Sequence, residues 1–277
     1  MPQYANAPVI PPGKSEMSQD DLQLLSYLLR KYTPKKVVEL GVAAGGTTTY
    51  ILDELNKSST LHSCDINKLY YRDTSQNTGY VAVEYYNRKR HPEWKQYFGE
   101  DISLCISKIG NNIDFVIMDT VHSLPGEFLN FLVIFPFLDD NSVIMLHDFG
   151  RHVYHIQKIW ENMEYVLEHK TVRESYCALL LYGALQSHEK IMSSAQIPNS
   201  CAVVIDKTLV LENLFPVFAM LFLPWSYMPN SGILTRVTGI ISDCYPRSLR
   251  NSASQFDYSD LFKKAVAYNR ALLRKKI

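Results

Sequence analysis

Residues 39–48 read ELGVAAGGTT and combine small side chains with three glycines. Gly41 allows the chain to turn tightly, and Gly45 and Gly46 allow the backbone to approach a ligand without a clash from a Cβ atom. A helix that starts there presents free N–H groups to the same ligand. Asp65 stands 24 residues after Gly41, and an acid at the end of the next strand can accept hydrogen bonds from a ribose diol. The spacing predicts a site for a ligand that contains a nucleoside.

A second group of polar residues follows two apolar segments later in the chain. Asp119 and His122 follow the run DFVIM, and His147 and Asp148 follow SVIML. An acid that ends a buried strand is costly unless it is paired, solvated or bound to a cation. Histidine titrates near neutral pH, so His122 and His147 are candidate general bases for a hydroxyl proton, with Asp148 beside them as a third candidate catalytic residue. A structural role is the alternative for each histidine.

These residues need strands whose carboxyl ends meet at one edge of a sheet. Short apolar runs predict buried strands, and apolar residues at helical spacing predict helices between them. The expected strands are 37–40, 61–65, 96–98, 114–119, 142–148 and 201–206. The expected helices are 18–33, which opens with a capping box and stops at Pro34, and 47–55, 81–89, 102–109, 127–135, 152–168 and 258–274. The alternation indicates βαβ units, whose right-handed crossovers bring the loops after the strands to one edge.

The expected fold is therefore an α/β, doubly wound, mostly parallel sheet with helices on both faces and an irregular helical C-terminal extension. The Pro-rich and polar residues 1–16 are expected to form a flexible N-terminal arm. Residues 17–208 would form the ligand-binding domain, and residues 209–277 the extension. Residues 214–245 are rich in aromatic side chains without a clear period. They can cap the site or form the contact of a homo-oligomer.

The glycine run also resembles the motif of a known family. Its pattern E-x-G-x-x-x-G-G-T-T differs from the dinucleotide pattern G-x-G-x-x-G, because position 43 is alanine. It is similar to the first motif of the class I S-adenosylmethionine-dependent methyltransferases, which have a Rossmann-like sheet. The D-x-x-H-S segment that starts at Asp119 and the strand that ends in His147-Asp148 look like the macrocin O-methyltransferase and cephalosporin hydroxylase-like group. The resemblance covers residues 19–148 and continues more loosely beyond them.

This resemblance implies roles for individual residues. Glu39 would lie near the methionine moiety of S-adenosylmethionine, and Asp65 would bind its ribose. Asp101, or alternatively Glu100, would flank the adenine, whereas a helix N-cap is the structural alternative for both. The implied cofactor-binding residues are Glu39, Gly41, Val42, Ala43, Gly45, Thr47, Thr48, Asp65, Ile66, Glu100, Asp101 and Asp119.

A magnesium ion is a further implication of the resemblance. Several relatives in this group hold Mg²⁺ between an acid after one strand and an acidic or amide pair after the next. Carried over by position, the implied ligands are Asp119 and Asp148. The sequence departs from that pattern, because His147 occupies one position of the pair and Mg²⁺ prefers oxygen ligands. In the alternative without metal, Asp119 contacts the amino group of the cofactor and Asp148 contacts the substrate.

Composition excludes several other classes of protein. Lys and Arg number 28, as do Asp and Glu, so the formal net charge is zero and a general nucleic-acid binder is not indicated. The longest apolar stretch, 213–225, is interrupted by two prolines and falls short of the roughly 20 residues of a membrane span. The five cysteines lack CxxC spacing, which indicates reduced thiols without a zinc site. Together with a start that does not look like a signal peptide, these features predict a soluble, cytoplasmic protein.

Four tyrosines between the second and third expected strands have two interpretations. Tyr70, Tyr71, Tyr85 and Tyr86 could line a sugar or aromatic pocket. Ordinary packing is the more common role, since tyrosine often buries its ring and leaves its hydroxyl in water.

The hypothesis from the sequence is an S-adenosylmethionine-dependent methyltransferase that acts on an oxygen nucleophile. The acceptor would be a small molecule or a sugar hydroxyl of a glycan precursor. The sulfonium is already activated, so catalysis would come mainly from proximity and alignment. Two alternatives remain open: a protein that binds S-adenosylmethionine without catalysis, and a nicotinamide-dependent oxidoreductase on the same fold.

Overall fold

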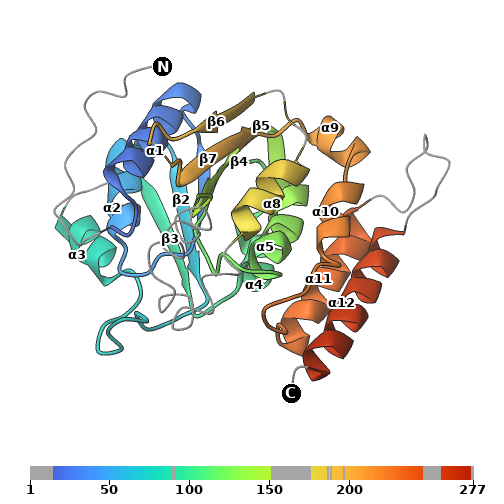
Figure 1. Cartoon of the computed structure of the whole chain (residues 1–277). Coiled ribbons are helices and arrows are strands. Elements are labelled where there is room, and N and C mark those ends of the chain that lie inside the picture. The colour runs from blue at the N-terminus through green and yellow to red at the C-terminus, as the bar shows by residue number, and fades with distance from the viewer. Residues whose placement is uncertain are drawn as a thin grey trace.

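The computed structural model describes residues 15–88, 92–150, 176–185, 187, 189–195, 197–245 and 257–275. Within these residues, a seven-stranded sheet has the order β3-β2-β1-β4-β5-β7-β6 (Figure 1). Strands β1 to β5 pair in parallel, whereas β7 is antiparallel to β5 and β6 is antiparallel to β7. The strands are β1 Lys36–Leu40, β2 Thr60–Asp65, β3 Glu93–Phe98, β4 Ile113–Met118, β5 Leu138–His147, β6 Glu189–Met192 and β7 Ser200–Val204.

Helices cover both faces of the sheet because successive side chains of a strand point to opposite faces. Val37 packs into a core with α1 and α2, and Val38 packs into a second core with α4, α5 and α8. The helices with their bounds are α1 Gln19–Tyr32, α2 Gly46–Glu54, α3 Tyr80–Arg88, α4 Ile102–Ile109, α5 Gly126–Ile134 and α8 Cys177–Ala184, with the 3-10 turn η1 at Phe135–Phe137. Figure 1 shows α1 to α3 and α4, α5 and α8 on opposite sides of the strands.

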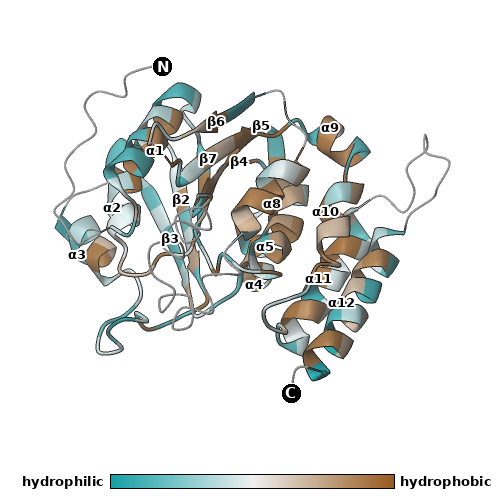
Figure 2. Cartoon of the chain, viewed as in Figure 1, coloured by the Kyte–Doolittle hydropathy of each residue, from teal (hydrophilic) through white to brown (hydrophobic). Residues whose placement is uncertain are grey.

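The C-terminal residues continue the core on the α5 side of the sheet. Their helices are α9 Lys207–Glu212, α10 Phe215–Met220, α11 Ser231–Cys244 and α12 Tyr258–Arg274. Phe218, Trp225 and Tyr258 are each about 1% exposed and belong to the same cluster of side chains as β4 and α5. Figure 2 shows apolar and hydrophilic residues alternating along α12, as in a helix with one buried and one solvated face.

The predicted fold class is confirmed, with differences at particular elements. All six predicted strands are present, but β7 runs antiparallel, and the short strand β6 and helix α8 were not predicted. α8 is apolar nearly all round, so its sequence lacks the amphipathic period that marks a surface helix. Residues 214–245 contain α10 and α11, and the predicted helix 152–168 lies outside the described residues. No helix in the described ranges has both the length and the apolar character that crossing a membrane requires.

Candidate functional site

A cavity of about 980 Å³ opens at the carboxyl ends of the parallel strands. The loops that follow β1, β2, β3 and β4 and the end of β5 contribute to its lining. Helix α5 lines it with Gly126, Leu129, Asn130 and Val133, which share one face of the helix. Tyr227 and the start of α11 line it from the C-terminal region. A volume near the upper end of the range of ligand pockets, roughly 300–1,000 Å³, leaves room for a cofactor and a second small molecule.

Two of the three loop glycines, Gly41 and Gly45, permit close packing of the chain against itself. Gly41 has φ +87°, and a Cβ atom there would lie 1.7 Å from the carbonyl oxygen of Asp119. Gly45 has φ +91°, and a Cβ atom there would lie 2.9 Å from Cβ of Ala82 and 3.0 Å from Cα of Gly79. Gly41 lines the cavity, whereas Gly45 faces α3 instead. The surroundings of Gly45 therefore indicate packing against α3, and not the close approach to a ligand that the sequence predicted.

The carboxylate of Asp65 holds the loop that follows β1. Its Oδ2 atom accepts hydrogen bonds from the backbone N–H groups of Val42 at 2.9 Å and Ala43 at 3.2 Å, and its Oδ1 atom accepts one from Asn67 at 2.8 Å. Ala43 has φ +52°, a left-handed conformation that is uncommon for alanine. Asp65, Val42 and Ala43 line the cavity, as do Thr47 and Ile66.

Glu39 points under helix α2 instead of into the cavity. Its side chain is fully buried and accepts hydrogen bonds from the hydroxyls of Thr48 at 2.9 Å and Ser63 at 2.6 Å. Burial raises the pKa of Glu39 to about 8, although the two hydroxyls act in the opposite direction. Neither Glu39 nor Thr48 is among the residues that line the cavity.

Glu100 and Asp101 both line the cavity after β3, and each has a partner within the protein. Glu100 pairs with Lys108 at 2.8 Å. Asp101 caps α4 by accepting a hydrogen bond from Ser103 N at 3.0 Å, as the structural alternative predicts, and also pairs with Arg236 Nη2 at 2.6 Å. Arg236, on α11, was not predicted; it ties the C-terminal region to this edge of the cavity.

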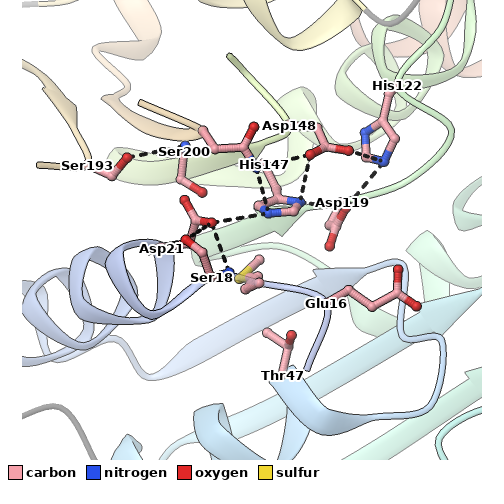
Figure 3. A network of polar contacts seen from close by, with 12 residues as sticks. Glu16, Ser18, Asp21, Thr47, Asp119, His122, His147, Asp148, Ser193 and Ser200 are labelled. Carbon is pink, nitrogen blue, oxygen red and sulfur yellow. Dashed lines mark hydrogen bonds and ion pairs between the residues drawn. The ribbon is translucent and has the colours of Figure 1, made fainter. Parts of the chain in front are cut away.

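The acids and histidines that follow β4 and β5 meet in one cluster (Figure 3). His122 Nε2 lies 3.1 Å from Asp148 Oδ2 and 3.5 Å from Asp119 Oδ1, and His122 Nδ1 lies 3.2 Å from Glu127 Oε1. His147 Nδ1 lies 3.0 Å from the same Asp119 oxygen, as an ion pair. The predicted convergence of the two strand ends is thus present in the geometry.

Two residues of this cluster have left-handed backbones. His122 has φ +55° and Asp148 has φ +54°. Histidine and aspartate adopt this region more readily than most residues. The conformation turns the chain sharply after Asp119 and after His147, and it brings both side chains back toward the cavity. Backbone conformations of this kind are concentrated at functional sites.

The carboxylates control the charge state of both rings. Burial lowers the pKa of His122, but Glu127 and the charges of Asp148 and Asp119 outweigh burial, so the net shift is upward. His147 behaves in the same way, and Asp119 makes the largest of the contributions that hold its pKa well above the ordinary value. Burial also raises the pKa of Glu127, which is 0% exposed. Both rings therefore hold a proton more readily than an ordinary histidine does.

The geometry does not support the expected magnesium site. No group of three or more His, Cys, Asp or Glu side chains in the described part of the chain is arranged to hold a metal ion. The carboxylates of Asp119 and Asp148 instead face ring nitrogens of His122 and His147. A hard cation that requires near-ideal octahedral oxygen ligands fits this set poorly.

Several residues at the site were missed from the sequence. Asp21, in the first turn of α1, lies 3.5 Å from His147 through Oδ2 and Nε2, whereas its place in the capping box indicates only the start of a helix. Ser15 lines the cavity and bonds to Thr47 through their hydroxyls at 2.9 Å. Among the tyrosines, Tyr70 and Tyr71 line the cavity, whereas Tyr86 packs edge-on against Trp94.

Comparisons with known proteins agree with this architecture. Residues 38–149 match a family model described as a methyltransferase domain, and no curated protein matches the chain. A candidate caffeoyl-CoA O-methyltransferase of Staphylococcus aureus is similar in structure, with a TM-score of 0.51, 11% identity, and coverage of 69% of this chain and 86% of that one.

Two further solved structures have lower scores. An O-methyltransferase of Bacillus cereus in complex with SAH has a TM-score of 0.47 and 14% identity, with 71% of this chain and 84% of that one covered. The O-methyltransferase TomG of Streptomyces achromogenes, involved in tomaymycin synthesis, has a TM-score of 0.47 and 15% identity, with 70% and 82% covered. The match over residues 38–149 to a methyltransferase domain agrees with the resemblance to class I methyltransferases.

Proposed function

We propose that the protein transfers the methyl group of S-adenosylmethionine to a hydroxyl group of a small molecule. The observation that carries this proposal is the position of Asp65. It stands at the cavity edge of β2, next to the loop that follows β1. From there its carboxylate can accept hydrogen bonds from a ribose diol while Asp101 and Ile66 flank an adenine, since all three residues line the same cavity.

The hydrogen bonds of the β1 loop favour a cofactor without phosphate. A pyrophosphate would need free backbone N–H groups at this loop. Two of them, on Val42 and Ala43, already donate to the Asp65 carboxylate, and a second anion beside Asp65 would be repelled. This geometry disfavours the nicotinamide dinucleotide alternative. S-adenosylmethionine brings a sulfonium and an amino group instead.

The charge of the His–Asp cluster also suits a cationic cofactor. Three aspartates, Asp21, Asp119 and Asp148, lie within 3.5 Å of His122 or His147. With both rings protonated, the aspartates still outnumber them. In this proposal Asp119 accepts a hydrogen bond from the amino group of the cofactor. His122 and Asp148 face the acceptor, whose hydroxyl is aligned for in-line attack on the methyl group.

Apolar side chains form part of the cavity wall beside the His–Asp cluster, where we place the acceptor. Val121, Leu129 and Met228 contribute to its lining beside the polar cluster. Such a wall suits an aromatic or other apolar body that carries the reacting hydroxyl. A sugar, which exposes hydroxyls in all directions, would leave more of its polar groups unpaired against this wall. We therefore favour a small apolar acceptor over a glycan precursor.

The test is isothermal titration of the purified protein with S-adenosylmethionine, S-adenosylhomocysteine and NADH, followed by the same titrations on Asp65→Asn. Loss of one charged hydrogen bond to the ribose should weaken S-adenosylhomocysteine binding about tenfold or more. Asp114→Asn is the matched control, because Asp114 also holds two successive backbone N–H groups, those of Lys35 and Lys36, but does not line the cavity. Binding of NADH alone, or equal effects of the two variants, would refute the proposal.

A further inference from the structure

Asp21 is more deeply buried than its role in a helix cap requires. Its Oδ2 atom accepts hydrogen bonds from Ser18 N at 3.1 Å and Ser18 Oγ at 2.6 Å, which completes the capping box of α1. The residue is 1% exposed, and although burial raises the pKa of its carboxyl group, His147, Ser18 and Ser200 together lower it. Burying a charged carboxylate is costly unless opposite charges or hydrogen-bond donors compensate it. The cap alone therefore does not account for this position.

The buried carboxylate faces the ring of His147, which is 4% exposed (Figure 3). Asp21 Oδ2 lies 3.5 Å from His147 Nε2, and Asp119 Oδ1 lies 3.0 Å from Nδ1 on the opposite side of the ring. Asp21 is not part of the cavity lining, whereas Asp119 is. The ring thus joins a carboxylate behind the site to a carboxylate inside it.

Other groups near the ring cannot take the place of Asp21. Asn199 Nδ2 lies 3.3 Å from His147 Nε2, but an amide N–H can only donate a hydrogen bond and carries no charge to balance a cationic ring, and it also donates to Asp148 Oδ1 at 3.0 Å. Asp148 Oδ1 is 3.8 Å from Nδ1, farther than Asp119. Asp21 is the carboxylate on the Nε2 side of the ring among the described residues.

We propose that Asp21 is a positioning residue, which fixes the orientation of the His147 ring so that Nδ1 holds the Asp119 carboxylate toward the cofactor. A partner on one ring nitrogen determines the proton on that nitrogen and the direction of the other. The first turn of α1 therefore contributes to the site without touching the ligand. This inference rests on the proposed function in one respect, the contact between Asp119 and the cofactor.

The test compares Asp21→Asn with Ser18→Ala in the full chain. Asparagine keeps an oxygen for the Ser18 cap but removes the charge beside His147. Alanine at Ser18 weakens the same cap and leaves that charge in place. Three quantities are measured for each variant: the unfolding midpoint, the affinity for S-adenosylhomocysteine by titration calorimetry, and the ¹⁵N shifts of the His147 ring nitrogens, assigned with His147→Gln.

Asp21→Asn should weaken S-adenosylhomocysteine binding by about tenfold or more, the range seen when a residue that orients a ligand-holding group is lost. It should also shift the His147 ring nitrogens. Ser18→Ala should lower the unfolding midpoint while leaving both other readouts unchanged. Equal loss of affinity in the two variants, or unchanged ring shifts in Asp21→Asn, would overturn the inference. If the wild-type protein fails to bind S-adenosylhomocysteine, the proposed function fails, and the ring shifts still decide whether Asp21 positions His147.

Discussion

Replacing Glu39 by glutamine should stabilise the protein increasingly as the pH rises. Glu39 is fully buried beneath α2, where burial raises its pKa to about 8. At neutral pH the folded protein must therefore keep a proton that the unfolded chain, with an ordinary pKa of 4.5, has lost. For a carboxyl group whose folded pKa is raised, the contribution to stability is complete below pH 4.5 and is lost as the pH climbs toward 8. Glutamine does not titrate, so the variant lacks this pH-dependent loss of stability.

The size of the effect follows from the two pKa values. Between pH 5 and pH 7 the wild-type protein should lose about 2.5 kcal/mol of unfolding free energy relative to Glu39→Gln. The difference at any single pH also includes changed hydrogen bonds, because glutamine has two N–H donors and finds only the hydroxyls of Thr48 and Ser63 nearby. An unpaired donor costs about 1–3 kcal/mol. The change with pH is therefore the more informative quantity.

The assay is urea unfolding of both proteins at pH 5, 6 and 7, with S-adenosylhomocysteine affinity measured alongside. The unfolding free energy of the variant should exceed that of the wild type by an amount that grows with pH. The affinity for S-adenosylhomocysteine should not change, since Glu39 is outside the cavity lining. If the difference in unfolding free energy between the two proteins stays constant above pH 5, Glu39 is ionised in the folded state. Weaker cofactor binding by the variant would instead support the role near the methionine moiety that the family resemblance implies.

Three further outcomes are expected. Gly41→Ala should lower the unfolding free energy by about 3 kcal/mol or more, because its Cβ atom would meet the Asp119 carbonyl at 1.7 Å; an unchanged urea midpoint would contradict this contact. Adding EDTA or Mg²⁺ should alter neither methyl transfer nor calorimetric binding of S-adenosylhomocysteine, and a heat of Mg²⁺ binding that Asp148→Asn abolishes would restore the metal site. Methyl transfer should rise with pH through a pKa above 6.5, because a protonated His122 cannot accept the hydroxyl proton; a profile that persists in His122→Gln would assign the proton to another group.

The sequence predicts best what depends on strand order. Asp65, Asp119 and Asp148 each follow an apolar run, and parallel strands bring such positions to one edge. The direction of the Glu39 side chain was harder to predict, because adjacent residues of a strand face opposite sides. A shift of one residue along β1 therefore moves a side chain from the cavity edge to the core under α2. Local spacing identified the residue type and the strand, but it did not identify the face.

Contacts between distant segments could not be predicted at all. Arg236 reaches Asp101 from a helix in a region where no period was noticed, although Leu234, Val237 and Ile241 are buried at helical spacing there. Asp21 has a sufficient local explanation as a helix cap, which conceals its contact with His147. A single sequence carries no signal for either pairing, since both depend on how whole helices pack onto the sheet.

The reversal of β7 divides the sheet into a parallel part and an antiparallel part, and the sequences of the two parts can change independently in evolution. Since β7 runs antiparallel to β5, with His147 opposite Ser200, the residues that precede this strand reach the edge where the loops of the other strands end. Asn199 thereby meets Asp148, and its carbonyl oxygen accepts a hydrogen bond from Phe149 N at 2.9 Å. In descendants of this chain, the connection between β6 and β7 can lengthen or change its composition without disturbing any βαβ crossover. New contacts to Asp148, and through it to the acceptor that we propose, can therefore arise there while the part of the sheet that carries Asp65 stays the same.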